Sequence, residues 1–294
     1  MGAAVRHRKP WKKILYEQQA YPDNHVDESF LNLLLLNAEP VSYSYAEAVE
    51  GTLVLTQRLV IVAVFIVAFL LTLDETMSVN TLIIINVATL VGGYGVFVAL
   101  TPSLASGRWR SMVRHNAKTL AIVYLTLLIV SPVLKTLTDS FSNDTIWALS
   151  TLFMLLHILT AHYERSANAL PSVQQTPFSF NAAIFASVLL VSRLPSAIHV
   201  FALISFAIEI FALAPLFNHR LHSYSLRASI AVTVSQACGV TGLLASTYSM
   251  FLGVAFGLSL LFITFVAPAG LLLIRRYKNT INGPWDEARP SLGT

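Results

Sequence analysis

The sequence predicts an all-α protein: a polytopic membrane helix bundle of about eight transmembrane helices with both termini in the cytosol. Apolar residues make up 55% of the chain and charged residues only 12%, whereas about a quarter of the residues of a soluble globular domain are charged. The mean hydropathy of +0.66 agrees with a membrane protein. The apolar residues gather in long runs, and Lys and Arg are divided unequally between the segments that join these runs.

The apolar runs set the expected number of helices. A helix needs roughly 20 apolar residues to cross a hydrocarbon core of about 30 Å. The fifth and sixth runs are separated at Arg193-Leu194-Pro195, because proline removes a backbone donor and disfavours helix at the preceding residue. If these two runs were one re-entrant element, an odd number of crossings would separate the termini. The eight runs cover residues 54–73, 79–101, 118–137, 145–162, 180–195, 197–217, 227–247 and 249–274.

By composition, the chain divides into three parts. Residues 1–52 are expected to form a cytosolic amphipathic N-terminal segment, residues 53–274 the transmembrane helix bundle, and residues 275–294 a cytosolic C-terminal tail. The first fifty residues are charged and aromatic and show no cleavable signal. We therefore expect the first spanning helix to target the chain to the membrane.

The N-terminal segment contains three local patterns. Trp11 and Tyr16, close to two lysines, are typical of an interfacial helix on a negatively charged leaflet. Residues 21–24, Tyr-Pro-Asp-Asn, predict a turn, because proline fixes φ and Asx side chains bond to the nearby backbone. The acidic start of residues 27–36 predicts a short helix.

The cations predict the orientation. With eight crossings and a cytosolic N-terminus, Lys135 and Arg193 are the only cations on the far side, as the positive-inside rule requires. Asp74, Glu75 and Asp144 would also lie on the far side, together with Asp139. The cytosolic segments would hold Arg6, Arg8, Lys9, Lys12, Lys13, Arg58, Arg108, Arg110, Arg114, Lys118, Arg165, Arg220, Arg227, Arg275, Arg276, Lys278 and Arg289.

Small residues indicate where helices approach closely. Gly253 and Gly257 have the G-x-x-x-G spacing that favours tight packing of membrane helices. We expect this pair to pack within the chain rather than against a second copy. The other glycines expected to allow close approach are Gly92, Gly93, Gly95, Gly239 and Gly242.

Charged side chains interrupt the apolar sequence at residues 131–146. Ionisable groups at or near bilayer depth are expensive, so they usually face a partner, a cavity or the membrane edge. Lys135 and Asp139 are four residues apart and would share one face of a helix. The alternative is a polar hairpin that caps two membrane helices, with Asp144 as the N-cap of a helix starting near Thr145.

Glu209 lies in the middle of an apolar run. A carboxyl group there must be protonated, paired or hydrated. A hydrogen bond of the neutral acid to another helix is one interpretation, and a lipid or proton pathway is the other. Arg193 is the natural cross-helix partner to test, because a buried guanidinium also needs an anion.

The sequence contains few candidates for catalysis or metal binding. It has no G-x-S-x-G, H-E-x-x-H, glycine-rich phosphate loop or paired-cysteine motif. His157 and His162 are five apart, a poor spacing for ligands on one helix face. His219 and His222 are expected in a cytosolic loop, where contact with lipid headgroups or solvent is favoured over a metal. No cofactor, metal or nucleic-acid partner is predicted.

Several stretches together resemble one known family, the PIG-C family of membrane subunits of the phosphatidylinositol N-acetylglucosaminyltransferase complex. The resemblance runs in order from near residue 13 to residue 288, and residues 76–118 and 226–275 share only the apolar character. The matching stretches are Lys13-Ile14-Leu15-Tyr16-Glu17-Gln18, Pro22-Asp23-Asn24, Val26-Asp27, Ser131-Pro132-Val133-Leu134-Lys135-Thr136-Leu137-Thr138, Asp144-Thr145-Ile146, Asn181-Ala182-Ala183-Ile184-Phe185-Ala186-Ser187, Ser192-Arg193-Leu194-Pro195, Phe206-Ala207-Ile208, Ile210-Phe211-Ala212-Leu213 and Asn282-Gly283-Pro284-Trp285-Asp286-Glu287-Ala288.

The resemblance implies a multi-pass subunit in the endoplasmic reticulum membrane. The family's complex transfers N-acetylglucosamine from its UDP sugar to phosphatidylinositol, the first step of GPI-anchor biosynthesis. In the family, sugar transfer belongs to a partner, the catalytic glycosyltransferase designated A, and smaller subunits such as H and P accompany it. No catalytic residue is therefore assigned here. The expected partner contacts lie in the two terminal segments: Trp11, Tyr16, Pro22, Asn24, Trp285 and Asp286.

Two other functions remain open from the residues alone. A lone lipid transporter or scramblase would use Lys135, Asp139, Arg193 and Glu209 along a polar path. An intramembrane transferase would build its site from the same charges together with His157. For a non-catalytic subunit, these charged residues, with Asp144, are expected to be polar structural or lipid contacts.

Overall fold

A computed structural model of the chain describes residues 18–19, 21–22, 25, 35–36, 44–100, 109–138, 140–161, 177–275, 277 and 281–282. Apart from one pair of two-residue strands, its regular structure is helical, so the predicted all-α class is confirmed. The helices are α1 (Tyr45–Leu73), α2 (Val79–Ala99), α3 (Trp109–Thr136), α4 (Asn143–Thr160), α5 (Pro177–Val191), α6 (Ala197–Ile208), α7 (Ala214–Tyr224), α8 (Leu226–Thr247), α9 (Met250–Leu261) and α10 (Ala267–Arg275).

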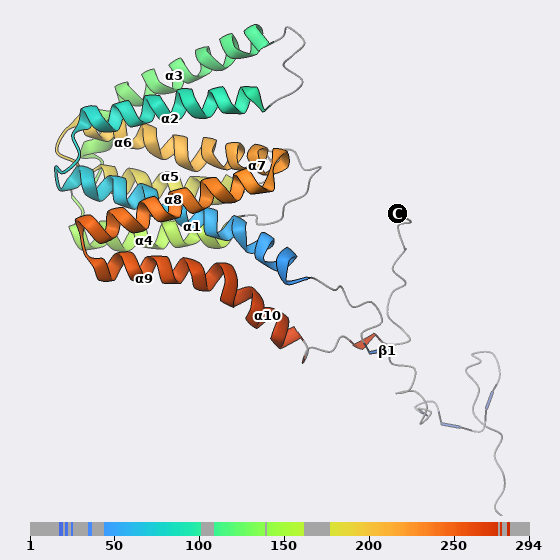
Figure 1. Cartoon of the computed structure of the whole chain (residues 1–294). Helices are drawn as coiled ribbons and strands as arrows, with labels where there is room; N and C mark the ends of the chain where they lie inside the picture. The colour runs from blue at the N-terminus through green and yellow to red at the C-terminus, as the bar shows by residue number, and fades with distance from the viewer. Residues whose placement is uncertain are drawn as a thin grey trace, which may run out of the picture. The chain divides into compact units, whose positions relative to one another are not determined.

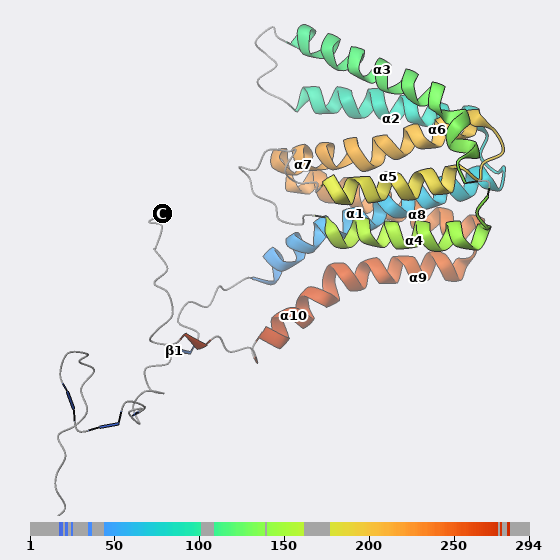
Figure 2. The same cartoon turned by 180° about the vertical axis from the view of Figure 1, so that it is seen from behind.

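Two short π-helical turns join helices into longer rods. The turn η4 (Glu209–Leu213) connects α6 to α7, and η5 (Phe262–Val266) connects α9 to α10. Counting each joined pair once, the described helices form eight rods, and successive rods in the bundle run antiparallel (Figures 1 and 2). Six of the described helical segments are long and apolar enough to cross a membrane, and α5 is a shorter apolar helix. Eight crossings and cytosolic termini stay predictions.

The break between the fifth and sixth apolar runs is confirmed. α5 ends at Val191, α6 begins at Ala197, and the residues between them form a turn that contains Pro195. α5 and α6 pack against each other as separate helices. Whether they cross the bilayer as two spans or as one re-entrant element stays a prediction, like the number of crossings.

The core of the bundle is built around α1, α5 and α6, with η4 beside them. Phe65 and Phe69 of α1 and Phe211 of η4 are fully buried, and the rings of Phe65 and Phe211 meet edge to face at 5.4 Å. α2, α3 and α9 instead expose most of their apolar side chains. Lipid tails are as apolar as leucine, so such faces are stable in a bilayer.

Three N-terminal predictions need correction or extension. Leu35 and Leu36 form a two-residue strand, β1 (Leu35–Leu36), which pairs antiparallel with β2 (Ile281–Asn282), so they do not end a short helix. α1 begins at Tyr45, before the predicted apolar run at residue 54. Arg58 is therefore more than three turns inside α1 and only 5% exposed, and it does not lie in a cytosolic segment. The proposed three-part division of the chain stays a prediction.

Prolines explain where the rods depart from regular α-helix. Proline lacks the N–H that would bond to the carbonyl four residues earlier. η5 ends two residues before Pro268, and this proline cannot donate to Thr264 O. The Thr52 hydroxyl of α1 lies 3.2 Å from Thr264 O and shares its hydrogen with Val49 O of its own helix, at 2.8 Å. η4 likewise ends two residues before Pro215. At Thr264 O, a side-chain hydroxyl from another helix thus replaces the missing backbone donor, as a membrane helix requires.

The G-x-x-x-G pair packs inside the chain, as predicted. A Cβ atom at Gly253 would lie 2.5 Å from Ala245 Cβ and 2.8 Å from Thr241 O, both in α8. At Gly257 it would lie 3.3 Å from Thr241 Cγ2. The close approach predicted for the other glycines is wrong within the described chain, since such an atom would meet nothing within 4 Å at Gly92, Gly93, Gly95, Gly239 and Gly242.

This difference between glycines is testable. Gly253→Ala is expected to lower the unfolding free energy by about 1–3 kcal/mol, because the added methyl group overpacks a contact with backbone. Gly239→Ala places the same methyl group in open space and serves as the control. Thermal unfolding of the two purified variants in the same detergent gives the comparison. Equal melting temperatures would contradict the α8–α9 packing described here.

Candidate functional site

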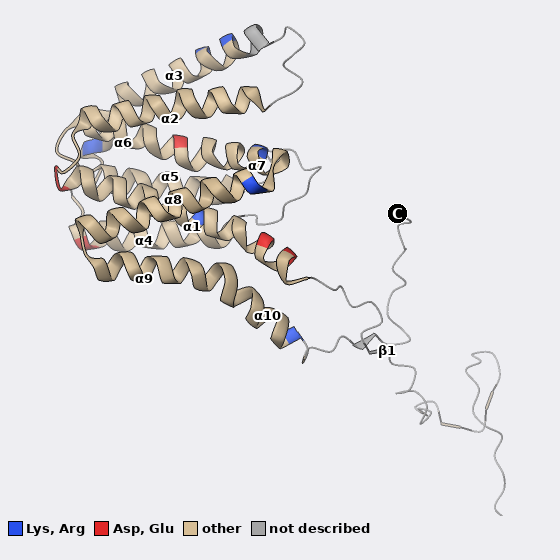
Figure 3. Cartoon of the chain, in the orientation of Figure 1, with Lys and Arg blue, Asp and Glu red and all other residues tan. Residues whose placement is uncertain are grey.

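The charged side chains of the bundle are concentrated at its two ends (Figure 3). The end where α1 begins holds Glu47 and Glu50 of α1, and its cations include Arg114 and Lys118 of α3, Arg220 of α7 and Arg227 of α8. We call this end the cation-rich end. The opposite end holds Lys135 and Arg193, and it also holds the acidic residues Asp74, Glu75 and Asp144. The predicted separation of the charges is therefore present in the fold.

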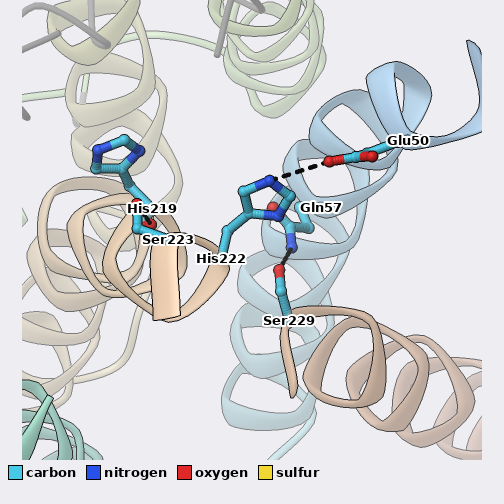
Figure 4. Close-up of polar contacts among 6 residues, drawn as sticks. All are labelled: Glu50, Gln57, His219, His222, Ser223 and Ser229. Atoms are coloured by element: carbon cyan, nitrogen blue, oxygen red, sulfur yellow. Dashed lines mark hydrogen bonds and ion pairs between the residues drawn. The ribbon is translucent and has the colours of Figure 1, made fainter. Parts of the chain in front are cut away.

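At the cation-rich end, α1, α7 and α8 meet through polar side chains (Figure 4). His222 Nε2 of α7 lies 3.3 Å from Glu50 Oε1 of α1. Further along α1, Gln57 Nε2 donates to Ser229 Oγ at 3.1 Å and to Thr233 Oγ1 at 2.8 Å. Gln57, Ser229 and Thr233 are buried, so these bonds fix α8 against α1.

The positions of the two histidines in this region differ from the prediction. His219 and His222 belong to α7, which continues to Tyr224, and not to a loop. The apolar run ends near residue 217, but the helix continues beyond it because hydrogen bonding of its backbone does not require apolar side chains. The Ser223 hydroxyl donates a hydrogen bond to the His219 carbonyl at 3.0 Å.

Glu209 is the centre of a second polar group, which we call the Glu209 cluster: Glu209, Tyr124 and Thr89. Glu209 belongs to η4 and is 6% exposed. The Tyr124 hydroxyl of α3 donates to Glu209 Oε1 at 2.5 Å, and Thr89 Oγ1 of α2 lies 2.7 Å from Glu209 Oε2. One carboxyl group therefore joins three helical rods.

The Glu209 cluster satisfies the carboxyl group in either protonation state. As a carboxylate, Glu209 accepts from both hydroxyls. As the neutral acid, it would donate from Oε2 to Thr89, whose own hydroxyl can turn to Ile85 O at 2.9 Å. Buried polar groups in an apolar medium need such partners. The neutral form predicted from the sequence thus stays a prediction, while the hydrogen bonds to other helices are present.

The predicted pairing of Glu209 with Arg193 is wrong. Arg193 lies in the turn between α5 and α6, and Glu209 lies more than three helical turns further along the rod. The Arg193 guanidinium instead donates to Thr138 O at 3.0 Å and to Phe141 O at 2.7 Å. Thr138 follows the C-terminus of α3, whose carbonyl groups carry partial negative charge and attract cations, and Phe141 directly precedes the N-cap of α4.

Lys135 also joins the C-terminal end of α3 to the turn between α5 and α6. Its Nζ donates to Pro195 O at 2.7 Å, and Thr138 and Ser192 share a hydrogen bond of 2.5 Å. We call Lys135, Thr138, Ser192 and Arg193 the turn cluster. It connects the end of α3 to the α5–α6 turn, and in it both cations bond to backbone carbonyls.

The N-cap prediction for Asp144 is wrong. α4 begins at Asn143, and the Ser142 hydroxyl accepts from the Thr145 N–H at 3.3 Å, so Ser142 is the N-cap. Asp144 lies exposed in the first turn, where a carboxylate still interacts favourably with the helix dipole. Asp139 lies outside the described residues, so its pairing with Lys135 stays a prediction.

His157 forms a fourth polar group, which sequence reasoning did not identify as structural. It is 1% exposed, and its Nδ1 lies 2.9 Å from both the carbonyl and the hydroxyl oxygen of Ser179 in α5. Its ring meets Phe211 edge to face at 5.3 Å. His157 therefore helps to join α4 to α5. The spacing of 22 residues between His157 and Ser179 gave no signal in the sequence.

The predicted partner contacts lie mostly outside the described residues. This applies to Trp11, Tyr16, Asn24, Trp285 and Asp286. Pro22 is described, and its carbonyl accepts from the His25 N–H at 2.9 Å, in agreement with the predicted turn. The partner role of all six residues stays a prediction.

The described polar groups do not converge on one catalytic arrangement. Within the described residues, no group of three or more His, Cys, Asp or Glu side chains is placed to hold a metal ion. The Glu209 cluster, the turn cluster, the His157–Ser179 contact and the contacts of Gln57 each connect different helices. Their common effect is to fix one helix against another.

Comparison with known proteins decides the family. A family model described as phosphatidylinositol N-acetylglucosaminyltransferase (GPI2) matches residues 11–286. The chain belongs to this family. It is 42% identical to a Dictyostelium discoideum protein named as the C subunit of that transferase, over 95% of this chain and 79% of the relative. It is 38% identical to the human protein of the same subunit name, over 95% of this chain and 92% of the relative. No solved structure matches.

A further relative extends the family to fungi. The phosphatidylinositol N-acetylglucosaminyltransferase GPI2 subunit of Schizosaccharomyces pombe is 32% identical over 98% of this chain and 89% of its own length. The family match thus covers the eight rods of the described fold. It confirms the resemblance found from the sequence.

The bonds of Gln57 give a quantitative test of the α1–α8 contact in this family member. Gln57→Leu and Thr233→Val should each destabilise the protein, and the double variant should lose less than their sum. The expected coupling free energy is about 1 kcal/mol, as for one buried hydrogen bond. Denaturation in detergent of the four proteins of this cycle measures it. Strict additivity would contradict a direct Gln57–Thr233 bond.

Proposed function

We propose that this chain is a non-catalytic membrane subunit of the complex that transfers N-acetylglucosamine from UDP-N-acetylglucosamine to phosphatidylinositol. This transfer is the first step of GPI-anchor biosynthesis. The observation that supports the proposal most strongly is the family match over residues 11–286, since relatives of this chain are named as subunits of that transferase. The proposal includes the endoplasmic reticulum membrane as the location.

The use of polar groups in the fold favours a non-catalytic role. A nucleotide-sugar site needs several polar side chains that converge on one ligand, whereas each described cluster of this chain connects helices to one another. We propose that the sugar transfer belongs to another polypeptide. We propose the catalytic glycosyltransferase designated A for this role, with the H and P subunits as further members of the complex.

The cation-rich end is the part of the bundle that we propose faces the reaction. Arg114, Lys118 and Arg227 are exposed there, and Arg220 is half-buried. Cations beside the apolar spans attract anionic lipid headgroups. Phosphatidylinositol is held in the bilayer by its tails, so a subunit that fixes the height of the transferase would bring the two reacting groups together.

The alternatives have less support. A transporter or scramblase would need a continuous polar path, but Lys135 and Arg193 bond to carbonyls at one end of the bundle while Glu209 bonds to hydroxyls in its interior. His157 is buried against Ser179 and does not join these charges. An intramembrane transferase built from the same residues is therefore disfavoured too.

Purification in mild detergent tests the proposal. Tagged chain from cells is expected to co-isolate with a glycosyltransferase and to support transfer of N-acetylglucosamine to phosphatidylinositol. The purified chain alone should show no transfer and no lipid flux in vesicles. Transfer by the chain alone from UDP-N-acetylglucosamine would overturn the non-catalytic role.

The role of the cation-rich end needs a separate test. Arg114→Gln with Lys118→Gln removes two exposed charges on one face of α3, four residues apart. We expect weaker binding to vesicles that contain phosphatidylinositol, because each cation near a charged surface contributes about 1 kcal/mol. Co-isolation of partner subunits is measured in parallel. Lost assembly with unchanged lipid binding would restrict this end to a scaffold role.

A further inference from the structure

The two ends of α3 are attached to the bundle differently. At its C-terminal end, the turn cluster joins α3 to the α5–α6 turn through Lys135, Thr138 and Arg193. Toward its N-terminus, the Tyr124 hydroxyl donates to Glu209 Oε1 at 2.5 Å. Two turns nearer the N-terminus, Asn116 Nδ2 donates to Tyr94 Oη of α2 at 3.1 Å.

Pro132 lies between these two attachments, inside α3. It cannot donate to Leu128 O, and the Ser131 hydroxyl donates to that carbonyl instead, at 3.0 Å. A side-chain bond satisfies the carbonyl without restoring the helical hydrogen bond. Prolines inside helices are the usual positions of kinks. α3 therefore has a point of low bending stiffness next to its firmly attached end.

The last turns of α2 can follow such a movement. Tyr94 joins them to Asn116 of α3, and Gly92, Gly93 and Gly95 lie in the same turns, where an added Cβ atom would meet no other atom within 4 Å. Glycine inside a helix lowers its stability relative to alanine. The Glu209 cluster lies just before these glycines, through Thr89.

We propose that residues 109–128 of α3 pivot at Pro132, and that the hydrogen bond from Tyr124 to Glu209 holds this part of α3 against the bundle. The moving part carries Arg114 and Lys118, so the bond decides where these cations stand relative to α7 and α8. Ala117 lies about 22 Å along the helix from Pro132 at 1.5 Å per residue, so a rotation of about 10° moves it by about 4 Å. The pivot does not depend on the proposed function.

The single cysteine of the chain makes the movement measurable. Cys238 is exposed on α8 and takes one spin label, and a second label is placed at exposed Ala117 of α3. Distances between them are measured by double electron–electron resonance on the full chain in lipid nanodiscs. Tyr124→Phe removes only the hydroxyl and keeps the ring near Phe201, whose centroid lies 6.3 Å away.

In Tyr124→Phe we expect a second, displaced distance for the 117–238 pair, with the ratio of displaced to original populations raised about tenfold. Glu209→Ala should populate the same displaced distance, and the double variant should add little to either. Thr126→Val is the matched control, because the Thr126 hydroxyl bonds to Ile122 O of its own helix.

A label at exposed Val133, beyond the pivot, separates pivoting from general loosening. The 133–238 distance should stay unchanged in every variant. Equal broadening at both positions would overturn the proposal in favour of a destabilised bundle. An unchanged 117–238 distance in both Tyr124→Phe and Glu209→Ala would overturn it as well, since the bond would then hold nothing in place.

Discussion

The fold depends on one constraint: inside an apolar medium, a backbone carbonyl that loses its helical donor is costly unless another group of the chain bonds to it. Pro132 and Pro268 each free a carbonyl, and the hydroxyls of Ser131 and Thr52 bond to Leu128 O and Thr264 O. The same chemistry satisfies the carboxyl group of Glu209, through hydroxyls of two other rods. Hydroxyl side chains therefore allow the irregular turns of the helices, and these turns determine how the rods pack.

This distribution of polar groups agrees with the proposed role of a subunit that does not itself perform the transfer. Gln57, Glu209 and His157 are buried and bond to other helices, while the exposed cations of the described bundle lie at one end. A membrane subunit of this kind contributes position and orientation to the lipid substrate and to its partner. Such contributions can account for a large part of a rate enhancement without any group of the subunit touching the reacting atoms.

The sequence was informative where the signal is local and less so where it depends on pairing in space. Apolar runs, the break at Pro195 and the spacing of Gly253 and Gly257 predicted helices, a turn and a close contact, because each depends on residues near in the chain. The partners of Glu209 could not be predicted, because two other rods supply them and a hydroxyl serves as well as a cation. The contact between His157 and Ser179 could not be predicted either, because it also depends on how two helices pair in space.

The remaining differences have equally specific causes. The N-cap of α4 is Ser142 rather than Asp144. Serine and aspartate both cap helices, and these two residues are only two positions apart, so the sequence did not show which of them precedes the first turn. Arg58 was expected at the entry of the first helix because the first apolar run begins near residue 54. A longer α1 places it in the interior, and length was underestimated because residues 45–53 are only moderately apolar.

The bond between Thr52 of α1 and Thr264 O also has a consequence for biosynthesis. The first described helix to be made supplies a hydroxyl that the last described rod needs once Pro268 has removed a backbone donor. A newly made final segment that met only lipid tails would keep an unsatisfied carbonyl. One flank of α1 must therefore stay accessible in the bilayer until η5 has been made, so that α1 and the last described rod close the bundle together.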